Sequence, residues 1–253
     1  MTRPVVAVLL DADDTLYDTR AAMHAAGAVA AAAAWPGADP RRLALAGVRF
    51  RDDPADHFGA YTRGEIEFEE MRRRRVADLA AWLGEETAGR SGAFDERYEP
   101  AFISALRAFP DVRPEVERLR SAGVVVGVLT NSSTRYTDAK MRAAGLVGLF
   151  DVVCTRDTLG VGKPDARAFH EACRRLGADP GATLHVGDEV VNDPLGARDA
   201  GLAAAWLVRD GRPDDGGLRL LAGRDVPVVT SLADLATLVP GGPPRFGVDE
   251  VGR

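Results

Sequence analysis

Apolar residues gather in six short, continuous runs, at residues 5–12, 124–131, 150–156, 183–188, 203–208 and 226–231. Within these runs apolar residues follow one another instead of alternating with polar ones. Strands that are covered on both faces have this pattern, because neither side of the strand meets water. The runs therefore predict a parallel sheet with helices packed on both sides.

Helical patterns separate the later runs. One is expected to begin at Pro114 and stop at Gly123, and others to span 134–144 and 164–177, with a further one near 195–200. Proline at a helix start and glycine at its end are typical boundary residues. Ser231 is expected to cap the last helix. This alternation of strand and helix predicts an α/β fold with a doubly wound parallel sheet.

The segment 18–105 interrupts the alternation, because it contains helix-forming stretches and no convincing strand. We interpret it as a small α-helical domain inserted after the first strand. The core domain is then expected to comprise residues 1–17 and 106–240. The final stretch, 241–253, is rich in proline and glycine and is expected to be a flexible tail.

The composition indicates which classes of partner and which cellular compartment to expect. The net charge is −6 and the isoelectric point is about 5.3, which argues against nucleic acid or an anionic membrane as a partner. The two cysteines, Cys154 and Cys173, are expected to be reduced core residues. The first apolar run ends in acids, so it predicts a strand and not a signal peptide. No run approaches the roughly 18 residues of a spanning helix, and we expect a cytoplasmic protein.

Side chains suited to metal and phosphate chemistry follow the proposed strands or lie in loops that can reach the same sheet edge. They are Asp11, Asp13, Thr130, Asn131, Lys163, Asp188 and Asp193. Ligands of open α/β sheets bind where the carboxyl ends of the strands meet. Like charges crowded there need compensation, and Mg²⁺ binds carboxylates while leaving positions for water and phosphate oxygens.

Four short motifs follow one another along the chain in the order found in a known family. They are LLDADDTL, the Thr130 end of VVVGVLTN, Lys163 of GKPD, and GDEVVND with Asp188 and Asp193. Together they resemble the haloacid dehalogenase superfamily, in its phosphatase type. The helical insert is similar to the small helical cap of that superfamily, which lies between its first and second motifs.

The resemblance implies a role for each matching residue. Asp11 would be the nucleophile that forms an aspartyl-phosphate, and Asp13 the general acid and base. Mg²⁺ would be held by Asp11, Asp188 and the main-chain carbonyl of Asp13, with Asp193 acting directly or through water. Thr130, Asn131 and Lys163 would bind the phosphoryl group. The expected function is a Mg²⁺-dependent phosphomonoester hydrolase acting on a small phosphorylated metabolite.

Other functions stay open on the same residues. A 2-haloacid dehalogenase shares the scaffold but typically lacks the second acid of the first motif, so Asp13 favours the phosphatase. A sugar-phosphate mutase would use a cap histidine, for which His24 is the candidate, one residue out of register. A receiver-like phosphoacceptor domain and a catalytically inactive regulator are further alternatives. The sequence fixes neither the substrate nor the oligomeric state.

Overall fold

The computed structural model describes residues 4–239 of the chain. These residues form two compact units. One unit combines the residues up to Tyr17 with those from Ala108 onward, and the other spans Asp18–Arg107. The tail expected at 241–253 lies outside the described residues.

The first unit is built on one six-stranded sheet in the order β3-β2-β1-β4-β5-β6, with every pair parallel. Its strands are β1 Ala7–Leu10, β2 Val125–Thr130, β3 Val152–Thr155, β4 Thr183–Gly187, β5 Ala203–Leu207 and β6 Val228–Val229. Every residue of β1 and of β4 is buried. The α/β fold with a doubly wound parallel sheet is confirmed.

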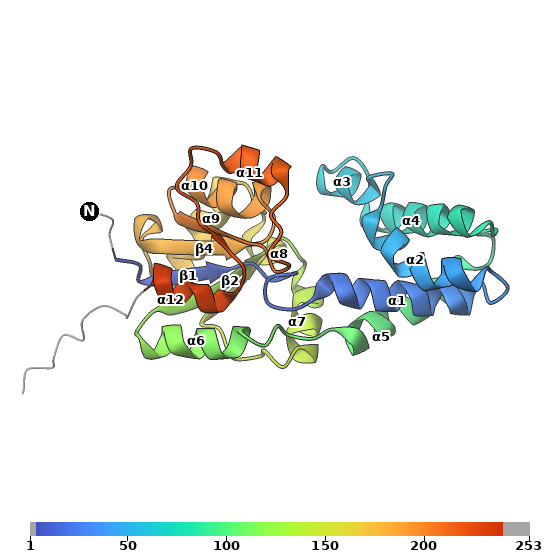
Figure 1. The fold of residues 1–253 in the computed structure, drawn as a ribbon, viewed down its shortest axis with the longest axis horizontal. Helices are drawn as coiled ribbons and strands as arrows, with labels where there is room; N and C mark the ends of the chain where they lie inside the picture. The colour runs from blue at the N-terminus through green and yellow to red at the C-terminus, as the bar shows by residue number, and fades with distance from the viewer. Residues whose placement is uncertain (1–3, 240–253) are drawn as a thin grey trace, which may run out of the picture. The chain divides into compact units, whose positions relative to one another are not determined.

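Helices cover both faces of this sheet. Those of the first unit are α6 Val112–Ser121, α7 Thr134–Ala143, α8 Arg156–Leu159, α9 Ala166–Leu176, α10 Gly196–Asp199, α11 Asp215–Leu221 and α12 Leu235–Leu238. Figure 1 shows α6 and α12 on one side of the sheet and α9 and α10 on the other. Leu9 of β1 packs with Phe169 of α9, which ties that helix layer to the central strand.

Two helix starts differ from the expected ones. The helix α6 begins at Val112, so Pro114 lies inside its first turn, where a missing N–H leaves no intrahelical bond unmade. The helix α9 begins at Ala166, because Asp165 is its N-cap and accepts from the Arg167 N–H. Pro164 therefore precedes the cap. Ser231 caps a single 3₁₀ turn, Leu232–Asp234, that leads into α12.

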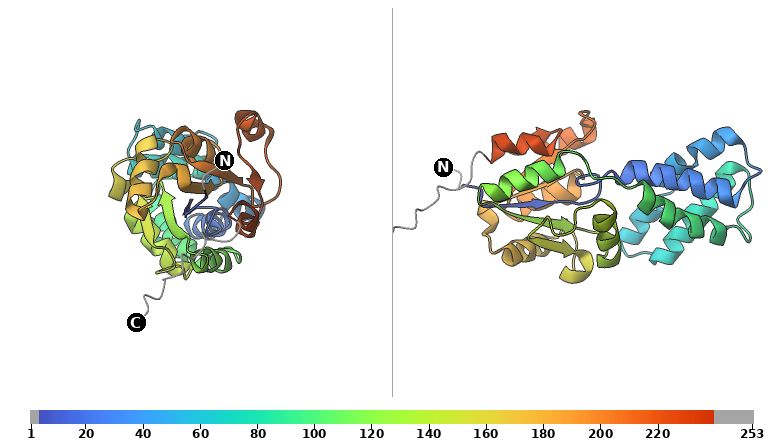
Figure 2. Two further views of the ribbon diagram at one scale, coloured as in Figure 1. Left: turned by 90° about the vertical axis from the view of Figure 1, so that its left-hand side faces the viewer. Right: turned by 90° about the horizontal axis from the view of Figure 1, so that it is seen from below.

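The second unit is entirely helical in its regular structure. Its helices are α1 Thr19–Ala34, α2 Pro40–Asp52, α3 His57–Thr62, α4 Phe68–Leu83 and α5 Ser91–Ala105. The helices α1 and α5 lie side by side, in blue and green in the right panel of Figure 2. A Cβ on Gly47 would lie only 1.8 Å from the His24 carbonyl oxygen, so α1 and α2 touch backbone to backbone.

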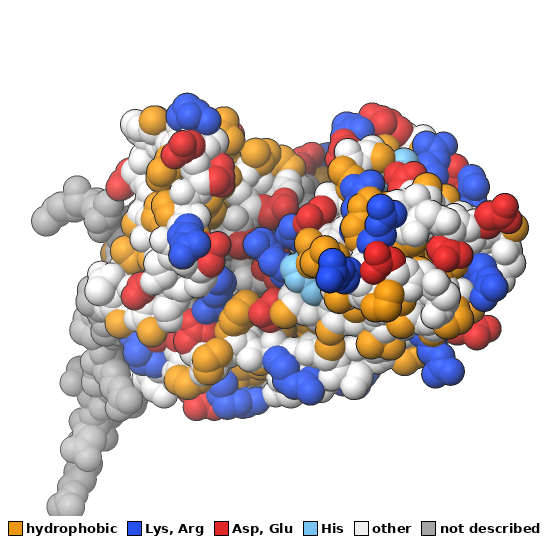
Figure 3. Space-filling view, turned by 45° about the vertical axis from the view of Figure 1, so that its right-hand side comes forward, with side chains coloured by type: hydrophobic (Ala, Val, Ile, Leu, Met, Phe, Trp, Pro, Cys, Tyr) orange, Lys and Arg blue, Asp and Glu red, His pale blue; other side chains and the backbone are white. Residues whose placement is uncertain are grey.

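The surface charges and the burial of the cysteines are those expected from the composition. On the face shown in Figure 3, basic and acidic side chains are interspersed. Cys154 and Cys173 are buried and free, as expected of core thiols. Among the described residues, no helix combines the length and the apolar character needed to cross a lipid bilayer.

Candidate active site

The sheet order brings together residues that are distant in the sequence. The strand β1 pairs with β2 on one side and with β4 on the other, so the chain winds outward in both directions from this point. Asp11 directly follows β1, and its N–H donates to the Val186 carbonyl of β4 at 2.8 Å. Asp188 directly follows β4. Both acids therefore lie at the switch point where open α/β sheets bind ligands.

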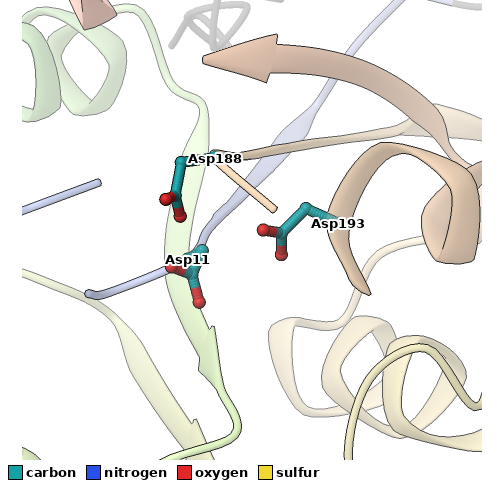
Figure 4. Close-up of side chains that lie close together, drawn as sticks. All are labelled: Asp11, Asp188 and Asp193. Atoms are coloured by element: carbon teal, nitrogen blue, oxygen red, sulfur yellow. The ribbon is translucent and has the colours of Figure 1, made fainter. Parts of the chain in front are cut away.

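Asp193 joins these two acids. One carboxylate oxygen from each of Asp11, Asp188 and Asp193 lies within 4.8 Å of the other two. Figure 4 shows the three side chains brought together at the strand ends. Asp11 and Asp193 are buried, and Asp188 is half-buried. Three acids so close together repel one another strongly at low dielectric.

Lys163 supplies positive charge at the cluster. Its Nζ donates to Asp11 Oδ1 at 2.5 Å and to Asp193 Oδ1 at 2.6 Å, and the side chain is only 3% exposed. One ammonium thus serves two carboxylates. In the part of the chain that the structure describes, no ion pair joins Asp188 to a cation.

The pKa values of the three acids follow from the shortage of positive charge around them. Burial, together with the nearby charges of Asp11 and Asp193, raises the pKa of Asp188 to about 9. Burial likewise raises the pKa of Asp11 to about 7, because Lys163 opposes the shift only in part. For Asp193, Lys163 and His185 outweigh burial and hold its pKa below the usual range. The shared ammonium therefore favours Asp193, and Asp11 and Asp188 need another cation to stay charged.

This donor set fits a divalent metal ion. Carboxylate oxygens are the ligands that Mg²⁺ prefers, and Mg²⁺ commonly takes one or two of them. Asp11 and Asp188 have the excess negative charge that such an ion would offset. Both oxygens of Asp193 already accept hydrogen bonds, from Lys163 and His185 at Oδ1 and from the Glu189 N–H at Oδ2.

Asn131 holds the loop that carries Lys163. Its Oδ1 accepts from the Lys163 N–H at 2.7 Å, and its Nδ2 donates to the Lys163 carbonyl at 2.9 Å. The amide is thus paired with main chain rather than presented to a ligand. Thr130 is buried at the end of β2, and its hydroxyl accepts from the Ser132 N–H at 3.1 Å. Phosphoryl binding by Thr130 and Asn131 stays a prediction.

Asp13 lies on a tight loop after β1. The Leu16 N–H donates to the Ala12 carbonyl at 2.8 Å, and Asp14 adopts a left-handed φ of 55° inside the turn. The Asp13 carboxylate contacts the ammonium of Lys140, at 2.7 Å from each oxygen. It is therefore not one of the three clustered acids.

Two contacts at the site were not anticipated from the sequence. Lys140 was not singled out, although it shares a face of α7 with the buried residues Thr137 and Met141. That three-and-four spacing is the signal that could have found it. His185 is a core residue as expected, but its Nε2 lies 2.9 Å from Asp193 Oδ1. Burial lowers the pKa of His185, so the neutral ring donates this hydrogen bond. His24, the candidate for a mutase, lies in α1 of the helical unit.

Comparisons with known proteins agree with this geometry. A family model described as a haloacid dehalogenase-like hydrolase matches residues 5–201. A phosphoserine phosphatase from Thermus thermophilus is 32% identical, over 82% of this chain and 90% of its own length. A phosphoglycolate phosphatase from Nitrosospira multiformis is also 32% identical, over 78% and 81% of the two chains.

A solved structure provides a further comparison. The crystal structure of a 2-haloacid dehalogenase from Pseudomonas syringae pv. Tomato matches with a TM-score of 0.60 and 28% identity. The match covers 93% of this chain and 98% of that one. The family model spans well over half of this chain, and the two phosphatases match along most of theirs. The chain therefore belongs to the haloacid dehalogenase-like hydrolases.

Proposed function

We propose that this protein is a Mg²⁺-dependent phosphomonoesterase that works through an aspartyl-phosphate on Asp11. The observation that carries the proposal is the meeting of Asp11, Asp188 and Lys163 at the switch point of the sheet. A second acid, Asp13, lies on the loop that follows the nucleophile. A nucleophile next to a separate acid and base is what two-step phosphate transfer requires.

In the first step, an oxygen of the Asp11 carboxylate attacks phosphorus. The bond from phosphorus to the leaving oxygen breaks, and Asp13 gives a proton to that oxygen, so an alcohol departs. Lys163 donates to Asp11 and so orients the attacking carboxylate. Because Lys163 also bonds to Asp193, its ammonium has a fixed place beside the incoming phosphoryl group.

In the second step, the Asp13 carboxylate takes a proton from a water molecule as its oxygen attacks phosphorus. The bond between phosphorus and Asp11 breaks, and inorganic phosphate leaves. Asp11 is again a carboxylate, and Asp13 again carries its proton for the next cycle. Both protons and both bonds at phosphorus are thereby accounted for.

Asp11 and Asp188 would hold the metal ion, together with the Asp13 carbonyl. When bound, Mg²⁺ supplies positive charge that offsets the charge of the phosphoryl group and of the clustered acids. Asp193 would position Lys163 and reach the ion directly or through water. The raised pKa values of Asp11 and Asp188 support this assignment, because they mark the two carboxyls that lack sufficient positive charge.

The substrate is proposed to be a small phosphorylated metabolite. The two relatives are named for phosphoserine and phosphoglycolate, both small phosphate esters that carry a carboxylate. Such compounds are therefore the first to be assayed, followed by sugar phosphates and nucleoside monophosphates.

The test is release of inorganic phosphate from this panel with Mg²⁺. Asp11→Asn should lower turnover at least about a thousandfold, because an amide is a poor nucleophile for phosphorus. Asp225→Asn, at an exposed acid far along the chain, is the matched control and should match the wild type. Near-normal turnover by Asp11→Asn would overturn the proposal.

A 2-haloacid dehalogenase is the second candidate, supported by the structural match to such an enzyme. That reaction releases a halide ion that needs no proton, so Asp13 would have no role as a general acid in it. Halide release from 2-haloacids that persists in a chelator, with no phosphate release from the panel, would favour this candidate over the phosphatase.

A further inference from the structure

Lys140 makes a paired contact with one carboxylate near the site. Its Nζ lies 2.7 Å from Oδ1 and 2.7 Å from Oδ2 of Asp13. The Lys140 side chain is 8% exposed, whereas that of Asp13 is 33% exposed. The ammonium thus approaches from the protein side and leaves part of the carboxylate open.

The helix α7 delivers this ammonium to the site. It starts soon after Thr130, and the Ser133 hydroxyl caps it by accepting from the Tyr136 N–H. Thr137 and Met141 place the same face against the protein interior. Burying an ammonium costs free energy unless a charged partner compensates it. Asp13 is such a partner, so its carboxylate stabilises the buried ammonium.

The backbone of the loop does not by itself determine the direction of the Asp13 carboxylate. Its backbone is held by the hydrogen bond from the Leu16 N–H to the Ala12 carbonyl and by that from the Asp14 N–H to the Tyr17 carbonyl. These bonds hold the backbone at Asp13, and the direction of its carboxylate depends in addition on the side-chain torsions. A cation that touches both oxygens restricts that turning.

We propose that Lys140 is a positioning residue for Asp13, an inference that rests on the proposed phosphatase function. It acts on the reaction through Asp13 by holding the carboxylate in the direction needed to give and take protons. The two buried lysines then contact different acids. Lys163 contacts the nucleophile and Asp193, whereas Lys140 contacts the general acid and base. Small losses of alignment at a catalytic group cost up to about a hundredfold in rate.

A double-mutant cycle tests this inference on the full-length enzyme. The four proteins are the wild type, Lys140→Met, Asp13→Asn and the double variant, assayed with Mg²⁺ and the best alkyl phosphate of the panel. Lys140→Met keeps the length of the side chain and removes its charge. We expect kcat to fall about tenfold to a hundredfold with KM within about twofold. In the Asp13→Asn background, the same change should alter kcat less than about twofold, because its target is gone.

Arg142→Met is the matched control, since Arg142 is exposed on the same helix. Its kcat should equal that of the wild type. If Lys140→Met does not fold, Lys140→Gln takes its place in the same cycle, because it also removes the charge and ends one bond short of the Lys140 Nζ.

Two results would overturn the inference. One is normal kcat in the folded Lys140 variant, and the other is a full additional loss in the Asp13→Asn background, which would indicate a role independent of Asp13. Failure of the proposed function has a different signature, in which the wild type releases no phosphate or Asp11→Asn keeps its turnover.

Discussion

Close approach of side chain to backbone shapes the site at the scale of single residues. A Cβ on Gly187 would lie 2.3 Å from Asp193 Cγ, so the last residue of β4 must be glycine for this carboxylate to lie against the strand. Asp193 in turn holds Lys163. The glycine before Asp188 is therefore part of what aligns the lysine.

Gly187→Ala is predicted to reduce turnover about a hundredfold, because Asp193 must move and Lys163 loses one of its two partners. Steady-state kinetics on the preferred phosphate ester measures the loss. Gly92→Ala is the control, since a Cβ there meets nothing within 4 Å. Equal kcat in the two variants would contradict this account of Gly187.

The sequence pattern predicted that the clustered acids and Lys163 would meet at one sheet edge, because carboxylates after buried strands have few structural uses, and the structure brings them together. It did not predict the contacts of Lys140 or His185, which depend on which helix or strand lies opposite. Arg75 gives a second example, in the helical unit. Its guanidinium lies 4.3 Å from the Phe50 ring centre and is buried, although arginine is usually found at the surface.

At the scale of elements, Asp111 joins three segments of the sheet-containing unit. Its Oδ2 accepts from Arg209 Nη1 at 2.6 Å, from Ser231 Oγ at 2.6 Å and from the Leu232 N–H at 2.8 Å. Arg209 also donates to the Thr15 carbonyl in the loop that carries Asp13. This network links the start of α6 and the turn before α12 to that loop.

Asp111→Asn is predicted to lower the free energy of unfolding by about 1–3 kcal/mol at neutral pH, because a half-buried charged partner is lost. Burial opposes the charge, but the hydrogen bonds from Arg209 and Ser231 outweigh it and lower the pKa of Asp111. Its folded pKa is then below its unfolded one. The stabilisation is therefore complete above the ordinary pKa of about 4 and is lost as the pH falls through the folded value.

Urea unfolding of the wild type and Asp111→Asn at about pH 7, 5 and 3 measures this dependence. The difference in the free energy of unfolding between the two proteins should be the same at the two higher pH values and smaller at the lowest. A gap that stays constant down to about pH 3 would contradict the role of the charge. Asp225→Asn controls for removal of an exposed acid.

Hydrophobic pattern predicted the six strands and the long helices well, since burial on both faces leaves a clear trace in the sequence. The short helices α3, α8 and α11 were not predicted, because their one or two turns show no clear period. The helix starts at Val112 and Ala166 were misjudged by two residues. Proline is compatible with several positions around a helix start, and the capping contacts decide among them.

At the scale of the whole molecule, strand order determines which residues meet. The segments after β1 and β4 become neighbours only because these two strands pair, although most of the chain lies between them. The parallel sheet was predictable, but its order was not, because pairing is decided by packing that no local pattern records. The chain divides into a sheet-containing unit and a helical unit, and the helical unit runs from Asp18 to Arg107.

The central claim is that Asp11 becomes phosphorylated, and mass spectrometry of a single turnover tests it most directly. Asp13→Asn is mixed with Mg²⁺ and an aryl phosphate, whose leaving group needs no proton from Asp13, and is stopped in acid. Loss of the base should then slow only water attack and let the intermediate accumulate. One added phosphoryl group is expected on the peptide that contains Asp11, and none when Asp11→Asn is combined with Asp13→Asn. Phosphate release without such a peptide, or a phosphoryl group on another residue, would contradict the account.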